Sequence, residues 1–102
     1  MKEISALELK NKLEAGELVE LIDVREDYEH EANNIGGTLM PLSSLMDHAM
    51  EIPKDKPVVL YCKKGIRSMI AIQRLSERHG YTNLINLKGG LDAYTSVSAD
   101  ND

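Results

Sequence analysis

The strongest constraint on the fold is the run at residues 57–61, Pro-Val-Val-Leu-Tyr, which is apolar at nearly every position and leads directly to Cys62. A near-continuous apolar run of this length is typical of a parallel strand that is covered on both faces. A short basic loop with one glycine, Gly65, follows, and then an apolar stretch at helical spacing. The pattern therefore places a cysteine thiol between the carboxyl end of a buried strand and the start of a helix.

Strand-like and helix-like segments alternate along the rest of the chain. A capping-box pattern at Ser5 and Glu8 predicts the start of a first helix. Further helices are expected over residues 42–50 and 69–79 and after Gly89-Gly90, with a short helical turn at 28–32. The other strand candidates cover residues 19–24, 38–40 and 83–87. This alternation predicts an α/β fold with a largely parallel sheet, in which the active site lies at the carboxyl ends of the strands.

The composition limits the classes of function. The 102 residues, 42% of them hydrophobic, suffice for one domain whose core is aliphatic, with Met46, Met50 and Met69 as filler. The formal net charge of −5 argues against nucleic acid or an anionic membrane as the main partner. Because no apolar run resembles a membrane span or a signal peptide, and a lone cysteine suits a reducing compartment, we expect a cytoplasmic protein. Residues 1–95 are expected to form the domain and residues 96–102 a flexible polar tail.

Cys62 is either a buried core residue, as free cysteines usually are, or a reactive thiol. The residues that follow favour the reactive thiol, because Lys63 and Lys64 are poor core formers. Gly65 permits a turn that points successive backbone N–H groups at one spot, where the start of the helix adds its positive dipole end. These groups stabilise an anion, and the thiolate is the nucleophilic form of cysteine. The pattern therefore predicts a lowered pKa for Cys62.

Two further residues complete the predicted loop. Arg67 offers a fork of donors that suits a bound oxyanion, and Ser68 can cap the helix or donate to the thiolate. Four residues separate the cysteine from the arginine, whereas tyrosine phosphatases have five. The tighter ring suits one extra sulfur atom on the thiol better than it suits a phosphoryl group. The expected substrate-binding residues are Lys63, Lys64, Gly65, Ile66, Arg67 and Ser68.

Four segments, in the right order, resemble the motifs of the single-domain rhodaneses, a family of sulfurtransferases. Residues 21–26 resemble the D-V-R signature, and residues 34–42 resemble the H-I-P-G-A segment with the proline that follows it. Residues 59–68 match the active loop C-x-x-G-x-R followed by serine, and residues 86–94 match the closing strand, Gly-Gly and helix. Three positions depart from the family pattern and are expected to alter loop stiffness rather than chemistry: Asn34, Gly36 and Tyr94.

The resemblance implies a single rhodanese-like domain with a central, mostly parallel five-stranded sheet flanked by helices on both faces. It also implies a ping-pong reaction, in which Cys62 takes the outer sulfur of a small anionic donor such as thiosulfate and holds it as a persulfide. Cyanide, a thiol or a protein thiol then removes that sulfur. The reaction needs no cofactor, and the three histidines lack the spacing of a metal site.

Asp23 and Arg25 stand at the end of the strand expected to neighbour the Cys62 strand. We expect them to support the site structurally, through a network with nearby carboxylates that fixes their loop. A direct contact of Arg25 with substrate is the alternative. The expected carboxylate partners are Glu26, Glu29 and Glu31.

Two other functions remain open on the same residues. One is a persulfide carrier or binding module for a protein partner, in which Lys63 and Lys64 serve docking. The other is a phosphatase or arsenate reductase, against which the length of the cysteine loop argues. A test for hydrolysis of an aryl phosphate distinguishes a phosphatase from a sulfurtransferase.

Overall fold

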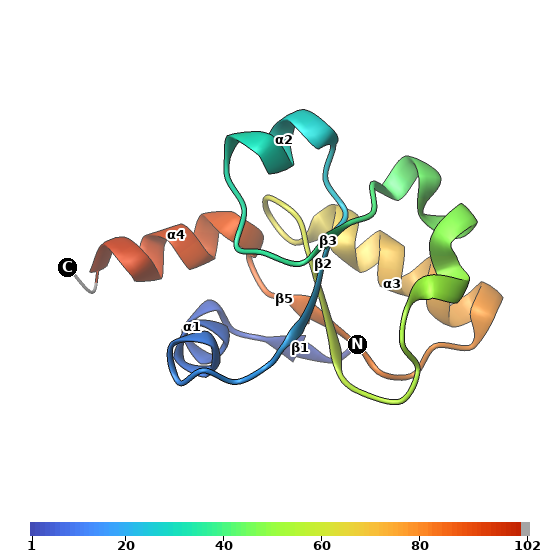
Figure 1. Ribbon diagram of the computed structural model, residues 1–102, viewed down its shortest axis with the longest axis horizontal. Helices are drawn as coiled ribbons and strands as arrows, with labels where there is room; N and C mark the ends of the chain where they lie inside the picture. Colours follow the sequence, from blue (N-terminus) through green and yellow to red (C-terminus); the bar gives the residue numbers. More distant parts are fainter. Residues whose placement is uncertain (101–102) are drawn as a thin grey trace.

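The computed structural model describes the backbone of residues 1–100 and the side chains of residues 1–97. It shows an α/β fold in which strands and helices alternate along the chain (Figure 1). The elements are β1 Glu3–Ile4, α1 Ala6–Glu14, β2 Glu20–Asp23, α2 Asp27–Ala32, β3 Thr38–Leu39, the 3₁₀ helix η1 Leu42–Glu51, β4 Val58–Tyr61, α3 Ile66–His79, β5 Leu84–Leu87 and α4 Gly90–Asp100. The capping box at Ser5 and Glu8 is present at the start of α1.

The sheet has five strands in the order β1-β5-β4-β2-β3, and every pair is parallel. The predicted α/β class and five-stranded sheet are confirmed. The apolar run is the central strand β4, where Leu60 stands between Ile22 of β2 and Asn86 of β5. The carboxyl ends of β2, β4 and β5 therefore meet at one edge of the sheet. The loop after Asp23 follows β2, Cys62 follows β4, and the Gly89-Gly90 turn follows β5.

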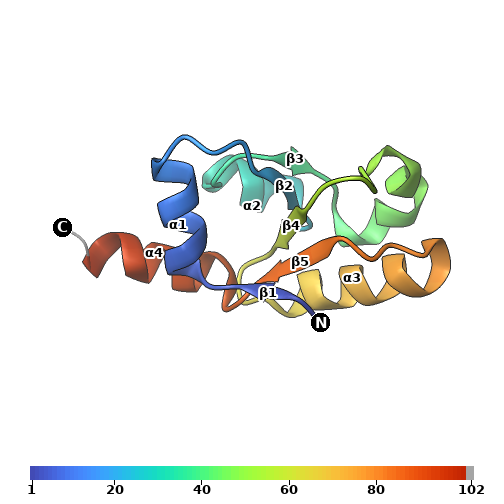
Figure 2. The same cartoon turned by 90° about the horizontal axis from the view of Figure 1, so that it is seen from below.

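Helices cover both faces of the sheet, with α1 and α4 on one side and α3 and η1 on the other (Figure 2). Alternate residues of β4 supply the two cores, because successive side chains of a strand point to opposite faces. Val59 and Tyr61 pack with Leu9 of α1 and Leu91 of α4. The residues of β4 on the opposite face, Val58 and Leu60, pack with α3 and η1.

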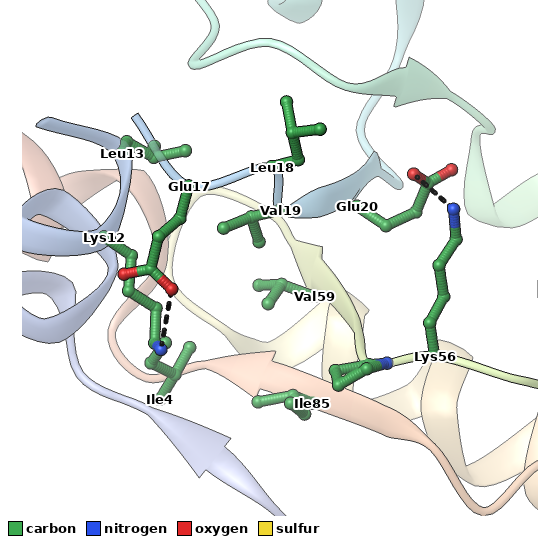
Figure 3. Close-up of a pocket in the computed structure, with 11 residues that line it drawn as sticks. Ile4, Lys12, Leu13, Glu17, Leu18, Val19, Glu20, Lys56, Val59 and Ile85 are labelled. Atoms are coloured by element: carbon green, nitrogen blue, oxygen red, sulfur yellow. Dashed lines mark ion pairs between the residues drawn. The ribbon is translucent and has the colours of Figure 1, made fainter. Parts of the chain in front are cut away.

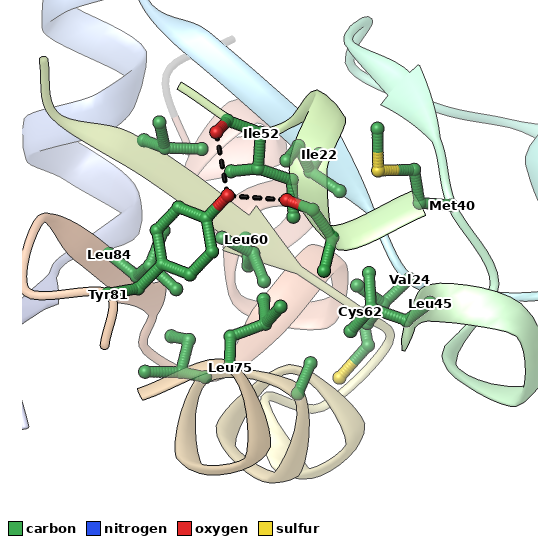
Figure 4. Close-up of a cluster of buried hydrophobic side chains, with 14 residues drawn as sticks. Ile22, Val24, Met40, Leu45, Ile52, Leu60, Cys62, Leu75, Tyr81 and Leu84 are labelled. Atoms are coloured by element: carbon green, nitrogen blue, oxygen red, sulfur yellow. Dashed lines mark hydrogen bonds between the residues drawn. The ribbon is translucent and has the colours of Figure 1, made fainter. Parts of the chain in front are cut away.

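Cys62 continues the second of these faces and belongs to the larger core cluster. Figure 4 shows it beside Val24 at the edge of that cluster, with its sulfur turned toward α3. On the same face, the hydroxyl of Tyr81 donates to the backbone carbonyls of Ala49 and Ile52, which ties η1 to the end of α3. The cysteine is thus a core residue by position, and its sulfur faces the helix start.

Two details differ from the sequence-based expectation. The segment after Pro41 is a 3₁₀ helix. With three residues per turn, Met50 lies on the same face as Asp47, and it is 84% exposed rather than in the core. Met69 is also largely exposed, at 44%. The flexible tail expected from residue 96 stays a prediction: α4 extends to Asp100, and residues 101–102 lie outside the described residues.

A hollow lies at the opposite end of the sheet from Cys62. It measures about 670 Å³ and opens at the amino ends of β2 and β4, with Val19, Val59 and Ile85 on its floor (Figure 3). Two ion pairs flank it, Lys12 with Glu17 and Lys56 with Glu20. Its lining includes no residue of the cysteine loop. Among the described residues, no helix is long and apolar enough to cross a membrane.

Candidate active site at the cysteine loop

Cys62 lies directly after β4, and only 1% of its surface is exposed. The chain turns at Gly65, whose φ of 91° is in the left-handed region that favours glycine, and α3 begins at the next residue. A side chain at this position would also crowd the end of β5, because a Cβ would lie 3.3 Å from the backbone carbonyl oxygen of Leu87. A shallow opening of about 170 Å³ reaches the cysteine between Lys64, Ile66 and Arg67. The loop therefore holds the thiol at the bottom of a small mouth.

Two backbone N–H groups donate to the sulfur of Cys62, and one hydroxyl group lies close to it. The backbone N–H of Gly65 donates to Sγ over 3.1 Å, and that of Ser68 over 3.4 Å. The Ser68 hydroxyl also lies 3.4 Å from Sγ. Both N–H groups belong to the start of α3, so the positive end of the helix dipole acts at the same place.

The pKa of Cys62 reflects a competition between burial and these donors. Burial raises it, whereas the hydrogen bonds from the Ser68 hydroxyl and from the backbone N–H groups of Ser68, Gly65 and Lys64 lower it. The donors outweigh burial, so the pKa lies below that of an ordinary thiol. A lowered pKa means that more of the sulfur is thiolate at neutral pH.

Asn86 of β5 supports the loop from behind, and our sequence analysis did not single it out. Its side chain is 1% exposed; its Oδ1 accepts the Ser68 hydroxyl over 2.5 Å, and its Nδ2 donates to the carbonyl of Gly65 over 3.3 Å. One buried amide thereby holds both residues whose N–H groups contact the sulfur. A signal for it was present: Asn86 is a polar residue in an otherwise apolar strand, near its carboxyl end.

The Gly89-Gly90 turn makes a close approach to the cysteine loop and is more than a simple turn. The backbone N–H of Leu91 donates to the carbonyl of Cys62 over 2.9 Å, and the backbone N–H of Asp92 donates to the carbonyl of Lys63 over 3.0 Å. A Cβ on Gly90 would lie only 2.5 Å from the Cys62 carbonyl oxygen. The start of α4 can therefore pack against the loop only with glycine at this position.

Two of the loop's three cations, Lys63 and Arg67, are paired with carboxylates. Lys63 Nζ lies 3.0 Å from Asp92 of α4, in a pair with both side chains about half exposed. Arg67 donates two parallel hydrogen bonds to Glu29 of α2, over 2.7 and 3.0 Å. These bonds hold the pKa of Glu29 down at about 2 and raise that of Arg67. The guanidinium expected to face a bound oxyanion thus faces Glu29 in this structure.

Asp23 and Arg25 pair with each other rather than with Glu26, Glu29 or Glu31. Both are buried, and the Arg25 guanidinium makes a two-pronged contact with the Asp23 carboxylate, with a shortest distance of 2.8 Å. The remaining partners are His30, 2.8 Å from Asp23, and the backbone carbonyl of Asn33, which accepts from Arg25 over 2.7 Å. Burial raises the pKa of Asp23, but the hydrogen bonds from Arg25 and His30 have the greater effect, so the pKa lies below its ordinary value. The expected network exists with other partners.

The three departures from the rhodanese pattern have structural roles. Asn34 closes a turn, because its Oδ1 accepts the Gly36 N–H over 2.8 Å and its Nδ2 donates to the His30 carbonyl. The Gly36 carbonyl accepts the hydroxyl of the buried Tyr61 over 2.8 Å. Tyr94 packs against the core that lies under α1 and α4. None of the three contacts the sulfur of Cys62.

The model of the rhodanese-like domain family matches residues 5–97. Since that match covers most of the 102 residues, the chain belongs to the rhodanese-like domain family.

Individual relatives agree with this assignment. The putative sulfurtransferase YtwF of Bacillus subtilis is 37% identical over 92% of this chain and 90% of its own length. The thiosulfate sulfurtransferase GlpE of Coxiella burnetii is 31% identical over 91% of this chain and 86% of its own. The uncharacterized protein YqhL of Bacillus subtilis is 49% identical over 70% of this chain, but the match spans only 56% of YqhL.

Solved structures share the whole architecture. The crystal structure of a rhodanese-like domain protein from Staphylococcus aureus superposes with a TM-score of 0.83, at 29% identity, and the match covers 92% of this chain and 91% of that one. The fold is therefore that of the family.

Proposed function

We propose that this protein is a sulfurtransferase that carries a sulfane sulfur on Cys62 as a persulfide. The observation that carries the proposal is the set of donors from Gly65 and Ser68 around a sulfur whose pKa is lowered. A persulfide is also an anion, and its outer sulfur extends from Cys62 into the mouth of the loop. The relatives that are named sulfurtransferases support the same reaction.

In the first half-reaction, the Cys62 thiolate attacks the outer sulfur of a donor such as thiosulfate. A sulfur–sulfur bond forms to Cys62, the bond between the two sulfurs of thiosulfate breaks, and sulfite leaves with the electron pair. No proton moves and no oxidant is needed, because the thiolate is already formed. The thiosulfate sulfurtransferase GlpE supports thiosulfate as one donor.

In the second half-reaction, an acceptor nucleophile attacks the outer sulfur of the persulfide and leaves Cys62 as the thiolate. Cyanide, a small thiol or a protein thiol has the required chemistry. The sequence has one cysteine, so no second thiol of this chain can receive the sulfur. A lone reactive thiol works best where disulfides do not form, and we therefore assign the protein to the cytoplasm.

A carrier dedicated to a protein acceptor is the second candidate, and the surface beside the mouth favours it. Ile66 and Met69 of α3 are 63% and 44% exposed next to the loop. Exposed apolar side chains beside the mouth are suited to contact a protein acceptor. Reversing the charges of Lys63 and Lys64 should then slow transfer to a protein acceptor more than transfer to cyanide.

The test is thiocyanate formation from thiosulfate and cyanide, measured for the wild type and for Cys62→Ser, with an aryl phosphate as a parallel substrate. We expect turnover in the wild type only, and no phosphate release. If folded wild-type protein forms no thiocyanate but hydrolyses the phosphate ester, the sulfurtransferase proposal is wrong.

A further inference from the structure

The two cations of the loop that have carboxylate partners are held very differently. The pair of Lys63 with Asp92 is about half exposed on both sides, so solvent competes with it and it opens easily. The pair of Arg67 with Glu29 has two short hydrogen bonds, and the Glu29 side chain is only 16% exposed. An incoming anion can therefore recruit Lys63 at little cost, whereas Arg67 is already occupied.

The position of this pair makes it part of the mouth. Arg67 lines the opening above Cys62. Glu29, which belongs to α2, reaches the opening by its contact with Arg67. The Glu29 carboxylate stays ionised at any physiological pH, because its pKa is about 2. The mouth therefore presents three cations against two carboxylates, and the Cys62 thiolate offsets the remaining positive charge.

We propose that Glu29, by occupying Arg67, is a specificity-determining residue that selects against dianionic sulfur donors in favour of donors with less negative charge. This inference rests on the proposed sulfur transfer through Cys62. The Coulomb energy of a donor in the field of Glu29 is proportional to the donor's charge, so a dianion is disfavoured twice as strongly as a monoanion. Glu29 therefore shifts the preference away from thiosulfate and toward donors that carry one negative charge or none.

Two donors isolate the effect of charge. Thiosulfate is a dianion, and the methanethiosulfonate anion carries one charge less while presenting the same outer sulfur next to sulfonyl oxygens. Both react with the Cys62 thiolate in the same way: the new sulfur–sulfur bond forms on Cys62, and sulfite or methanesulfinate leaves with the electron pair. Charge is conserved in both reactions, and neither needs another reactant.

The experiment measures the second-order rate of sulfur loading onto the whole protein, by the mass gain of one sulfur atom, with each donor and without an acceptor. Glu29→Gln keeps a hydrogen-bond acceptor for Arg67 and removes the charge. We expect loading by thiosulfate to rise about tenfold and loading by methanethiosulfonate about threefold, so that the ratio of the two rates shifts. The shift should shrink as salt is added.

Two control variants sharpen the result. Glu31→Gln removes a charge from an exposed position on the same helix and should leave both rates unchanged. Asp92→Asn removes the partner of Lys63 and should change the ratio less than Glu29→Gln does, because that pair is exposed. A purely structural role of Glu29 would change both donors' rates by one common factor.

The outcomes separate this inference from the function on which it rests. If Cys62 gains sulfur from both donors but the ratio of rates is the same in Glu29→Gln as in the wild type, the selection by Glu29 is wrong and sulfur transfer stands. If neither donor loads any variant, the proposed function is wrong, and the inference falls with it.

Discussion

Two sets of polar residues surround Cys62, and they differ in what holds them in place. The buried set is at most 3% exposed, and its members hydrogen-bond with one another or with the backbone. It consists of Asp23, Arg25, Ser68 and Asn86. The rim is made of the loop's three cations, two of which have carboxylate partners, on α2 and α4. It consists of Lys63, Lys64 and Arg67.

The buried set fixes the geometry of the site, whereas the rim sets the charge around its mouth. Among the described side chains, five polar or charged residues are buried, and the four of the buried set stand at the carboxyl edge of the sheet. Leaving any of them without a partner costs the full desolvation of a polar group, so they fix the loop. The lysines of the rim are solvated, so they adjust the affinity for charged ligands, whereas Arg67 is also held by Glu29. Substitutions in the buried set should therefore lower stability, and substitutions in the rim should change rates.

The largest expected effect follows removal of one partner of the buried ion pair. Arg25→Ala leaves the Asp23 carboxylate unpaired in the interior, which should lower the free energy of unfolding by about 3–5 kcal/mol. Urea denaturation measures this, and Arg74→Ala on the exposed side of α3 is the matched control, with a change within about 0.5 kcal/mol. Loss of sulfur transfer at unchanged stability would instead give Arg25 a direct contact with substrate.

A smaller loss of stability should follow a substitution where α4 packs on the loop. Gly90→Ala combines a positive φ of 61° with a clash against the carbonyls of Cys62 and Lys63, and should cost roughly 2–4 kcal/mol. Gly80→Ala has a similar φ of 69° but meets nothing within 4 Å, so it should cost about 1–2 kcal/mol. Equal losses in urea denaturation would show that the close approach of Gly90 adds nothing.

The pair of Arg67 with Glu29 predicts a dependence of stability on acid. Glu29 has a lowered pKa of about 2 in the folded protein against an ordinary 4.5, so its contribution is full above about pH 4.5 and is lost as the pH falls toward 2. The free energy of unfolding should fall between neutral and acid pH. We expect this fall to be smaller in Glu29→Gln than in the wild type, by about 1–2 kcal/mol after allowance for solvent screening. Unfolding curves of both proteins against pH measure it. Parallel curves would contradict a stabilising pair.

The smallest effect should come from the rim alone. Lys64→Gln removes an exposed charge beside the mouth, and should lower the rate of sulfur loading by thiosulfate about twofold to threefold at low salt. The free energy of unfolding should not change measurably. High salt should abolish the difference from the wild type, and a salt-independent loss would mean that Lys64 acts by more than its charge.

The sequence predicts most of this architecture because its patterns are local. The run at 57–61 identifies the central strand, and the glycine and serine beside Cys62 indicate the cradle of N–H groups. The two-residue strand β1 is too short to show a pattern, and Met50 was misplaced because a 3₁₀ helix repeats every three residues. Contacts between distant segments, such as Glu29 with Arg67 and Asn86 with Ser68, depend on tertiary packing, so local patterns do not show which residues pair.

The account depends on Cys62 being a stabilised thiolate, and a titration of that thiol tests it most directly. The ultraviolet absorbance of the thiolate is recorded against pH for the wild type, with Cys62→Ser as the blank, and again for Ser68→Ala. We predict a midpoint below the ordinary thiol value of about 8.5, and a rise of about one unit or more when the Ser68 hydroxyl is removed. A wild-type midpoint at or above the ordinary value would contradict the account, because burial would then outweigh the donors around the sulfur.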